Sequence, residues 1–276
     1  MSHIKLGQTG LIVRTGGFDT SFLQRLEFDK AISALNRILD VGVNFIGTSN
    51  ANRNSKEKIG TAISGRRNEF ILSAITTANN PFDFWRSLDE SLSILRTDHF
   101  EIYQFQNPEK MPRSGDGSGL YEDMLMARNQ GKIRFIGIST FRFQVAREAI
   151  LSGLYDILQF PFCYLSDERA FELVRLCNER GVGFIAGDVQ GSGLINDSRL
   201  SLEWLIEYGS VAPLWDAKDT EELNHLLTIL IGEPAALTEA ERELINNDRR
   251  DLAEEYRQRV FNRDLSTIEA QGAHLT

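Results

Sequence analysis

The amino-acid sequence predicts an α/β protein with the architecture of a (β/α)8 TIM barrel. Short runs rich in Val, Ile and Phe alternate along the 276 residues with segments whose apolar residues recur at helical spacing. The short runs are apolar throughout, which is typical of parallel strands that helices cover. About eight strand–helix units can be counted, and eight such units close into a barrel.

The predicted elements begin with a hairpin over 3–14, where a Gly-centred turn joins two short apolar runs and could plug the lower end of the barrel. Eight predicted strands follow, at 16–20, 44–48, 70–76, 100–106, 133–139, 156–162, 183–189 and 210–215. The predicted helices cover 29–42, 82–96, 119–130, 142–152, 167–180, 199–208 and 219–230, and another begins within 42–60. In the segment 82–96, for example, Leu88, Leu92 and Leu95 fall on one helical face.

The chain is expected to form one domain over 1–276, because no shift in composition and no Pro/Gly/Ser-rich linker divides it. The charged segment at about 236–262 is predicted as a C-terminal extension of extra helices. The segment 108–119, PEKMPRSGDGSG, leaves the end of the fourth strand. It is either a lid over the upper face or a plain surface connection.

Net charge and cysteine content limit the classes of partner and compartment. The formal net charge is −9 and no Lys/Arg cluster stands out, so nucleic acid and membranes are not expected as partners. A small-molecule ligand is expected, and a protein partner stays open. The start MSHIKLGQTG lacks the apolar core of a signal peptide, and Cys163 and Cys177 give no disulfide framework, so a cytoplasmic protein is expected. His3, His225 and His274 show no metal-ligand spacing, and no metal is expected.

An ordered series of motifs resembles the aldo-keto reductases. The pieces are LGQTGLIV, ILDVGVNFIGTS, SLSILRTDHFEIYQFQNP, GKIRFIGIST, ILQFPF and ERGVGFIA, and the resemblance runs in order over about 5–230. In that family the barrel binds NADPH without a Rossmann domain. A tetrad of Asp, Tyr, Lys and His reduces a carbonyl, and the tyrosine protonates the carbonyl oxygen.

Transfer of this tetrad onto the sequence finds a replacement at each position. The family's strand-two motif, D-T-A-x-x-Y-G-x-S-E, lies without gaps on 47–56, which puts Gly47 at the aspartate and Asn52 at the tyrosine. The lysine falls on Ile75 and the histidine on Gln106. Carbonyl reduction needs a proton donor whose pKa a nearby cation tunes, and asparagine cannot be that donor at neutral pH. The resemblance therefore implies the fold of a reductase without its tetrad.

The positions that the family uses for the cofactor are altered as well. Gly187 stands where the family often has a tyrosine that stacks on the nicotinamide, and Asp216 would repel a 2′-phosphate. Ser139–Thr140 matches the family's S-N pair in part, and Gln159 is retained. The loop QGSGLINDSRL, over 190–200, is short, although its GSG turn could receive a phosphate through backbone N–H groups. No cofactor is expected, with NADP(H) binding lost or weak.

Polar side chains gather at the predicted strand ends, which converge at the upper face of a barrel. Asp19 and Asp188 are acids where the family usually has glycine and serine, so we expect them to act as a catalytic pair. Only strand eight separates their strands, so the carboxylates could lie within roughly 10 Å, and burial would divide acid and base roles. The alternative is that each acid caps the following helix. Gln106 and Asn52 are predicted to orient the substrate by hydrogen bonds.

A second group of side chains is predicted to contact the substrate. It consists of Arg53, Asn107, Ser139, Gln159, Gln190 and Trp215. Arg53 could grip a carboxylate as a fork, and a solvated loop arginine is the alternative. Trp215 and Phe18 either wall the pocket or belong to the core. His99, at the start of the fourth strand, and Cys163 are expected to be structural.

Three classes of function follow from these residues. New acids in a pocket without a tetrad favour a non-redox enzyme: a lyase, dehydratase or isomerase that acts on a small polar metabolite in a specialised biosynthetic pathway. The alternatives are a NAD(P)H-dependent oxidoreductase of atypical mechanism and a non-catalytic barrel that binds a ligand or a partner protein. Barrels host unrelated activities, so the fold does not choose among these classes.

Overall fold

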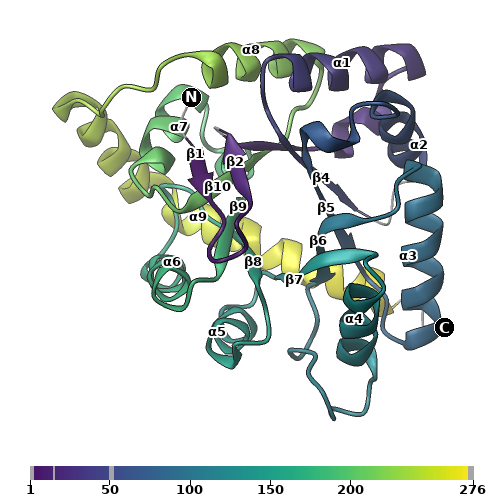
Figure 1. Cartoon of the computed structure of the whole chain (residues 1–276). Coiled ribbons are helices and arrows are strands. Elements are labelled where there is room, and N and C mark those ends of the chain that lie inside the picture. The colour runs from purple at the N-terminus through teal and green to yellow at the C-terminus, as the bar shows by residue number, and fades with distance from the viewer. Residues whose placement is uncertain (1–2, 15, 50–52, 273–276) are drawn as a thin grey trace.

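Eight parallel strands close into a barrel at the centre of the described chain (Figure 1), in the order β10-β3-β4-β5-β6-β7-β8-β9. The structure is a computed structural model that describes residues 3–14, 16–49 and 53–272. The strands are β3 (Gly17–Asp19), β4 (Phe45–Ser49), β5 (Ile71–Thr76), β6 (Phe100–Gln106), β7 (Ile133–Ser139), β8 (Ile157–Pro161), β9 (Gly183–Gly187) and β10 (Val211–Trp215). Each predicted strand is present, so the expected (β/α)8 fold class is confirmed.

A hairpin precedes the barrel and closes its lower end, as the sequence predicts. Strands β1 (His3–Lys5) and β2 (Ile12–Arg14) pair antiparallel. Their buried side chains pack on the apolar residues that fill the lower interior, Phe45, Ile71, Ile102, Ile157 and Ile185. The turn depends on Gly7, which has a φ of 51°, and a Cβ there would lie 2.3 Å from the carbonyl oxygen of Gly181. Only glycine fits so close an approach.

Helices surround the barrel, and local signals explain where they begin. They are α1 (Phe28–Asp40), α2 (Arg53–Ala62), α3 (Pro81–Leu95), α4 (Leu120–Asn129), α5 (Phe143–Ser152), α6 (Glu168–Arg180), α7 (Ser198–Ile206), α8 (Thr220–Ile231) and α9 (Glu239–Gly272), with 3₁₀ turns η1 (Ser21–Arg25), η2 (Arg67–Glu69) and η3 (Gly191–Gly193). Helix α3 begins after Asn80, whose side chain accepts the N–H of Asp83 at 2.9 Å. Its Leu88, Leu92 and Leu95 are buried, as the helical spacing predicts. None of the helices in the described ranges is long and apolar enough to cross a membrane.

The last helix, α9, reaches beyond the predicted extension and crosses the upper end of the barrel, where Figure 1 shows it in yellow behind the strands. Its 34 residues span about 51 Å at 1.5 Å per residue. Asp248 accepts a hydrogen bond from the Tyr164 hydroxyl at 2.8 Å, and Arg263 pairs with Asp188 at 2.9 Å. Tyr256 is buried in the main core. Helix α9 therefore packs on the segments that follow β8 and β9.

The segment 108–119, expected to be a lid or a surface connection, is tied to the outer layer of the barrel. The carbonyl oxygen of Pro112 accepts the Tyr155 hydroxyl at 2.5 Å, and Met111 is buried. Asp116 accepts the N–H of Arg113 at 3.0 Å and that of Ser118 at 2.8 Å. These contacts favour an anchored surface connection.

Candidate active site

A cavity of about 400 Å³ opens at the upper end of the barrel, beside the ends of β8, β9, β10 and β3. Its walls include four carboxylates, two cations and three amides, namely Asp19, Asp188, Asp216, Glu222, Lys218, Arg263, Gln159, Gln190 and Asn196. We call this cavity the cleft. Because the carboxyl ends of the strands converge, four of the residues predicted from the sequence, Asp19, Gln159, Asp188 and Gln190, share it. A second cavity, of about 460 Å³, lies between α9 and the starts of α5 and α6, and its walls include none of the predicted site residues that the structure describes.

Asp19 is the last residue of β3 and its carboxylate lies inside the cleft. Oδ1 accepts the N–H of Ser21 at 2.8 Å. Burial, with a smaller contribution from the neighbouring Asp216, raises the pKa of this carboxyl to about 6. Its Oδ2 lies 3.7 Å from the position that a Cβ at Gly47 would occupy. The Asp19 carboxyl therefore occupies space beside the position at which the resemblance places the family's aspartate.

Asp216 is a second acid of the cleft and directly follows β10. Its Oδ1 accepts the N–H of Ala217 at 2.9 Å and the hydroxyl of Ser21 at 3.3 Å. Burial raises the pKa of Asp216 as well. Ser21 thus contacts both acids, one through its backbone and one through its side chain.

Asp188, the expected partner of Asp19, lies in the same cleft but is bound by several donors. It has a φ of 55°, which aspartate tolerates better than most residues. Its Oδ1 accepts the N–H of Ser192 at 2.9 Å, and its Oδ2 accepts the Ser192 hydroxyl at 2.6 Å. Arg263 donates to Oδ1 at 2.9 Å, and the Asp188 side chain is only 8% exposed. These contacts join β9 to α9.

Two glutamines present their amides at the cleft. The Oε1 atom of Gln159 accepts from the Nε2 atom of Gln104 at 2.9 Å. Gln190 donates to Glu222 at 3.1 Å. Both amides are therefore oriented by protein partners before any ligand enters.

The remaining predicted residues lie outside the cleft. Gln106 and Ser139 end the paired strands β6 and β7. Asn107 is fully buried and donates to Asp264 of α9 at 2.7 Å. Arg53 forms ion pairs with Glu57 and Glu90 on the surface, and its side chain is 66% exposed. Trp215 is fully buried in the core, as is Phe18, and Asn52 lies outside the described residues.

The GSG turn does not offer its N–H groups to a phosphate, so that expectation is wrong. Gly191 donates to the carbonyl oxygen of Asp188 at 2.9 Å, and Gly193 donates to that of Gln190 at 3.0 Å. Ser192 donates its N–H to the Asp188 carboxylate. The turn folds back on itself and uses all three donors.

Sequence reasoning missed three residues that shape the cleft. Arg263 lies on a helix with charges on every side, so no pattern distinguishes it. The sequence indicates Asp216 only as a residue that would repel a 2′-phosphate, because its contact with Ser21 joins residues 195 positions apart. Gln104 lies within the strand FEIYQFQ, and a polar residue inside this mostly apolar run is the signal that could have indicated it.

A parallel eight-stranded barrel with its polar cleft at the strand ends is the architecture of many enzymes that act on small molecules. The chain belongs to the aldo/keto reductase family, whose model matches residues 14–230.

Two curated relatives share part of this sequence. L-galactose dehydrogenase of Arabidopsis thaliana is 26% identical over 212 residues, which cover 70% of this chain and 66% of that protein. D-threo-aldose 1-dehydrogenase of a Pseudomonas species is 25% identical over 133 residues, which cover 47% of this chain and 40% of that protein. The chain thus spans less than two thirds of either relative's length.

Solved structures share the fold. The holo form of an aldo-keto reductase from Bacillus halodurans superposes with a TM-score of 0.77 at 20% identity, covering 90% of this chain and 96% of that one. An aldo/keto reductase from Klebsiella pneumoniae, in complex with NADP and acetate, gives a TM-score of 0.74 at 19% identity, covering 89% of this chain and 94% of that one.

The expectation that no cofactor is bound is contradicted by these neighbours. The Klebsiella protein carries NADP in a barrel of the same fold, which points to nicotinamide binding by barrels of this kind. The expectation came from single replaced residues, Gly187 and Asp216 among them. A dinucleotide makes many contacts spread over several strand ends, so the loss of some of them does not decide binding.

Proposed function

We propose that this chain is a nicotinamide-dependent oxidoreductase that interconverts a hydroxyl and a carbonyl group on a small polyhydroxylated substrate, with Asp19 as its acid–base group. The observation that carries the proposal is the partly buried carboxyl of Asp19 in the cleft, beside the strand position at which the family has its aspartate. The family itself and the dehydrogenase names of the two relatives support a redox reaction.

The cleft has space for a nicotinamide ring and donors for phosphate oxygens. A Cβ built on Gly187 would meet no atom closer than 3.8 Å, so a flat ring has space above the end of β9. Lys218, Asn196 and Arg263 line the same cavity and can donate to phosphate oxygens. A bound nicotinamide would supply the hydride acceptor or donor.

Asp19 can move the proton that accompanies this hydride. With a pKa of about 6, its carboxyl is mostly ionised at neutral pH and can take the proton of a substrate hydroxyl as the carbonyl forms. In the reverse direction the protonated acid returns that proton to the carbonyl oxygen. A pKa near the working pH serves both directions. Gly47, Ile75 and Gln106 stand where the family's aspartate, lysine and histidine are expected, so Asp19 takes over a role that those residues do not provide.

The polar walls of the cleft favour a substrate with several hydroxyl groups. Carboxylates accept from hydroxyls, and amides both donate and accept. The two relatives are named for galactose and for an aldose, both of which are sugars. We therefore assign aldoses and related polyols as the substrate class.

The test is oxidation of an aldose and polyol panel, followed by the appearance of reduced nicotinamide from NADP⁺ or NAD⁺. The variant Asp19→Asn should lose about 10²- to 10⁴-fold in kcat while it still binds the cofactor. The matched control is Asp219→Asn, which alters the cap of α8. Asparagine caps as well as aspartate, so the control should keep its kcat. Full turnover by Asp19→Asn would remove Asp19 from the mechanism.

A non-redox reaction, such as that of a lyase, dehydratase or isomerase in a specialised biosynthetic pathway, is the second candidate. The pair of acids around Ser21, Asp19 and Asp216, favours it, because both have raised pKa values and can share acid and base roles. Asp188, first expected as the second acid, is bound by Arg263 and Ser192, so we assign Asp216 instead. Product formation without any change in the nicotinamide would favour this candidate. Cofactor binding without any product would favour a binding protein.

A further inference from the structure

Three polar side chains form a hydrogen-bonded row inside the barrel, directly below the cleft. They are Ser73 of β5, Gln104 of β6 and Gln159 of β8. The Nε2 atom of Gln104 donates to Gln159 Oε1 at 2.9 Å and to Ser73 Oγ at 3.2 Å. Gln104 and Ser73 are buried, whereas Gln159 reaches the cleft. The row therefore connects the closed interior to the site.

Gly137 makes room for Gln104. The two residues are partners on the neighbouring strands β6 and β7. A Cβ on Gly137 would lie 2.7 Å from Cγ of Gln104 and 3.1 Å from its Oε1. Any larger residue at position 137 would push the Gln104 side chain out of the row. The glycine in β7 and the glutamine in β6 therefore depend on each other.

The direction of the two amides follows from the cost of burying polar atoms. In the described structure, Oε1 of Gln104 is buried without a hydrogen-bond partner. If both amides turned over, the NH₂ group of Gln104 would take that place with two unmatched donors. Buried N–H groups without acceptors are rarer than carbonyl oxygens without donors. The arrangement with Gln104 as donor is therefore the favoured one.

This direction determines what Gln159 presents to the cleft. Its Oε1 is turned inward to Gln104, so its NH₂ group faces outward. The Nε2 atom lies 3.8 Å from the position of a Cβ on Gly187, at the edge of the space above β9. A donor at this edge selects an oxygen acceptor on whatever occupies the space.

We propose that Gln104 is a positioning residue that holds the Gln159 amide with its NH₂ group toward the cleft, so that this edge of the site recognises an acceptor oxygen of the bound ligand. The inference builds on the proposed function of the cleft as a nicotinamide and substrate site. Gln104 touches no ligand, and it acts through Gln159 alone.

The first experiment measures the amides without any ligand. In protein labelled with ¹⁵N, the NH₂ protons of Gln104 should exchange slowly with solvent and those of Gln159 quickly. In Gln104→Met, which keeps the side-chain volume but removes the donor, the Gln159 resonances should shift and broaden as its amide is released. Slow exchange at Gln159 in the unaltered protein would overturn the proposal, because its NH₂ group would then be turned inward.

The second experiment is a double-mutant cycle on NADPH binding, with Gln104→Met, Gln159→Leu and both together. Each variant should raise the Kd for NADPH about tenfold, and the double variant should raise it no further, because Gln104 acts through Gln159. The exposed Gln130 at the end of α4 gives the control, Gln130→Met, which should leave the Kd unchanged.

Two outcomes of these measurements are decisive, and a second variant covers the case in which Gln104→Met does not fold. Additive losses would assign Gln104 a general structural role and overturn the proposal. If Gln104→Met fails to fold, Gln104→Glu gives a second measurement, since a carboxylate cannot donate to Gln159 and should turn its amide over. If the unaltered protein does not bind NADPH while the exchange result holds, the amide orientation stands, and both the proposed function and the ligand contact fail.

Discussion

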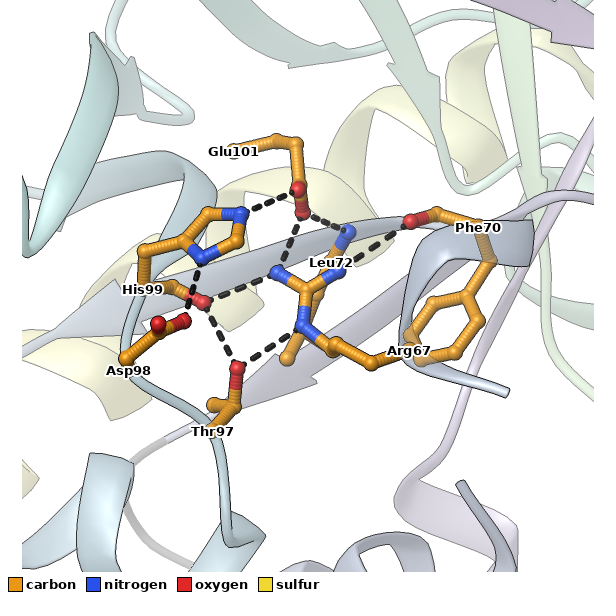
Figure 2. Close-up of polar contacts among 7 residues, drawn as sticks. All are labelled: Arg67, Phe70, Leu72, Thr97, Asp98, His99 and Glu101. Carbon is orange, nitrogen blue, oxygen red and sulfur yellow. Dashed lines mark hydrogen bonds and ion pairs between the residues drawn. The ribbon is translucent and has the colours of Figure 1, made fainter. Parts of the chain in front are cut away.

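Two clusters of acids at opposite ends of the barrel differ in how their charges are matched. The lower cluster contains Glu101 and Asp98, and the upper cluster contains Asp19 and Asp216. At the lower end, Glu101 accepts from the Arg67 guanidinium at 2.7 Å and from the N–H of Leu72 at 2.8 Å, and His99 Nε2 lies 2.9 Å from its other oxygen (Figure 2). At the upper end, Asp19 accepts the N–H of Ser21, and the charged neighbour that acts on it most is another acid. The lower acid contributes to structure, whereas the upper one has a proton that can be exchanged near neutral pH.

The lower cluster is further tied to the backbone. Arg67 donates to the carbonyl oxygen of His99 at 2.8 Å and to the Thr97 hydroxyl at 2.8 Å, as Figure 2 shows. His99 lies 2.6 Å from Asp98, and this contact lowers the pKa of Asp98. The lower cluster thus links η2, the start of β5 and the start of β6. This agrees with the structural role that the sequence predicts for His99.

The largest expected effect on stability comes from breaking the lower cluster. Glu101→Leu leaves Arg67 with no carboxylate partner in a site where its side chain is 17% exposed. We expect the free energy of unfolding to fall by about 3–5 kcal/mol, measured by urea denaturation. The control Asp98→Asn changes a carboxylate that is 93% exposed and should be nearly silent. If Glu101→Leu is as stable as the unaltered chain, the ion pair of the lower cluster does not stabilise the fold.

The second effect is the pH dependence that Asp19 imposes. Its pKa rises from 3.8 to about 6 on folding, so the folded state binds more protons between these values. The contribution of Asp19 to the free energy of unfolding is therefore fully present below pH 3.8. It is lost as the pH rises through 6, by about 3 kcal/mol in total. Asp19→Asn should remove this loss, so the variant should be more stable than the unaltered chain at pH 8 and similar at pH 4. Parallel curves for the two proteins across this range would contradict the raised pKa.

A smaller effect is expected where α9 meets the cleft, at the ion pair between Arg263 and Asp188. Arg263→Gln removes a pair between Asp188 and a side chain that is 49% exposed, so the free energy of unfolding should fall by about 1 kcal/mol or less. Hydrogen exchange in α9 should nevertheless become faster, because one of its ties to the barrel is lost. Arg257→Gln is the matched control, since Arg257 pairs with Glu254 within the same helix. If hydrogen exchange in α9 is equally fast in both variants, the Arg263–Asp188 pair does not hold the helix to the barrel.

The smallest effect is expected at Arg53. Its two ion pairs, with Glu57 and Glu90, lie on the surface and its side chain is 66% exposed. Arg53→Gln should change stability by less than about 0.5 kcal/mol and leave the KM of any substrate unchanged. A raised KM would show that Arg53 contacts the substrate, as the sequence predicts.

The sequence by itself determined the barrel and part of its cleft. Alternation of apolar strands with helices is a local pattern, and eight units have one common closed arrangement. That arrangement brings strand ends together, so Asp19, Gln159, Asp188 and Gln190 could be assigned to one cleft without coordinates. Their chemical roles stay predictions for the experiments above.

Only the tertiary structure decided how the charges in the cleft are paired. Arg263 reaches Asp188 across 75 positions of sequence, and Ser21 reaches Asp216 across 195. Helix α9 carries charges on all sides, so its pattern does not say which residue meets the barrel. The raised pKa of Asp19 depends on burial and on a neighbour from another strand, and these are properties of the packed chain rather than of any segment.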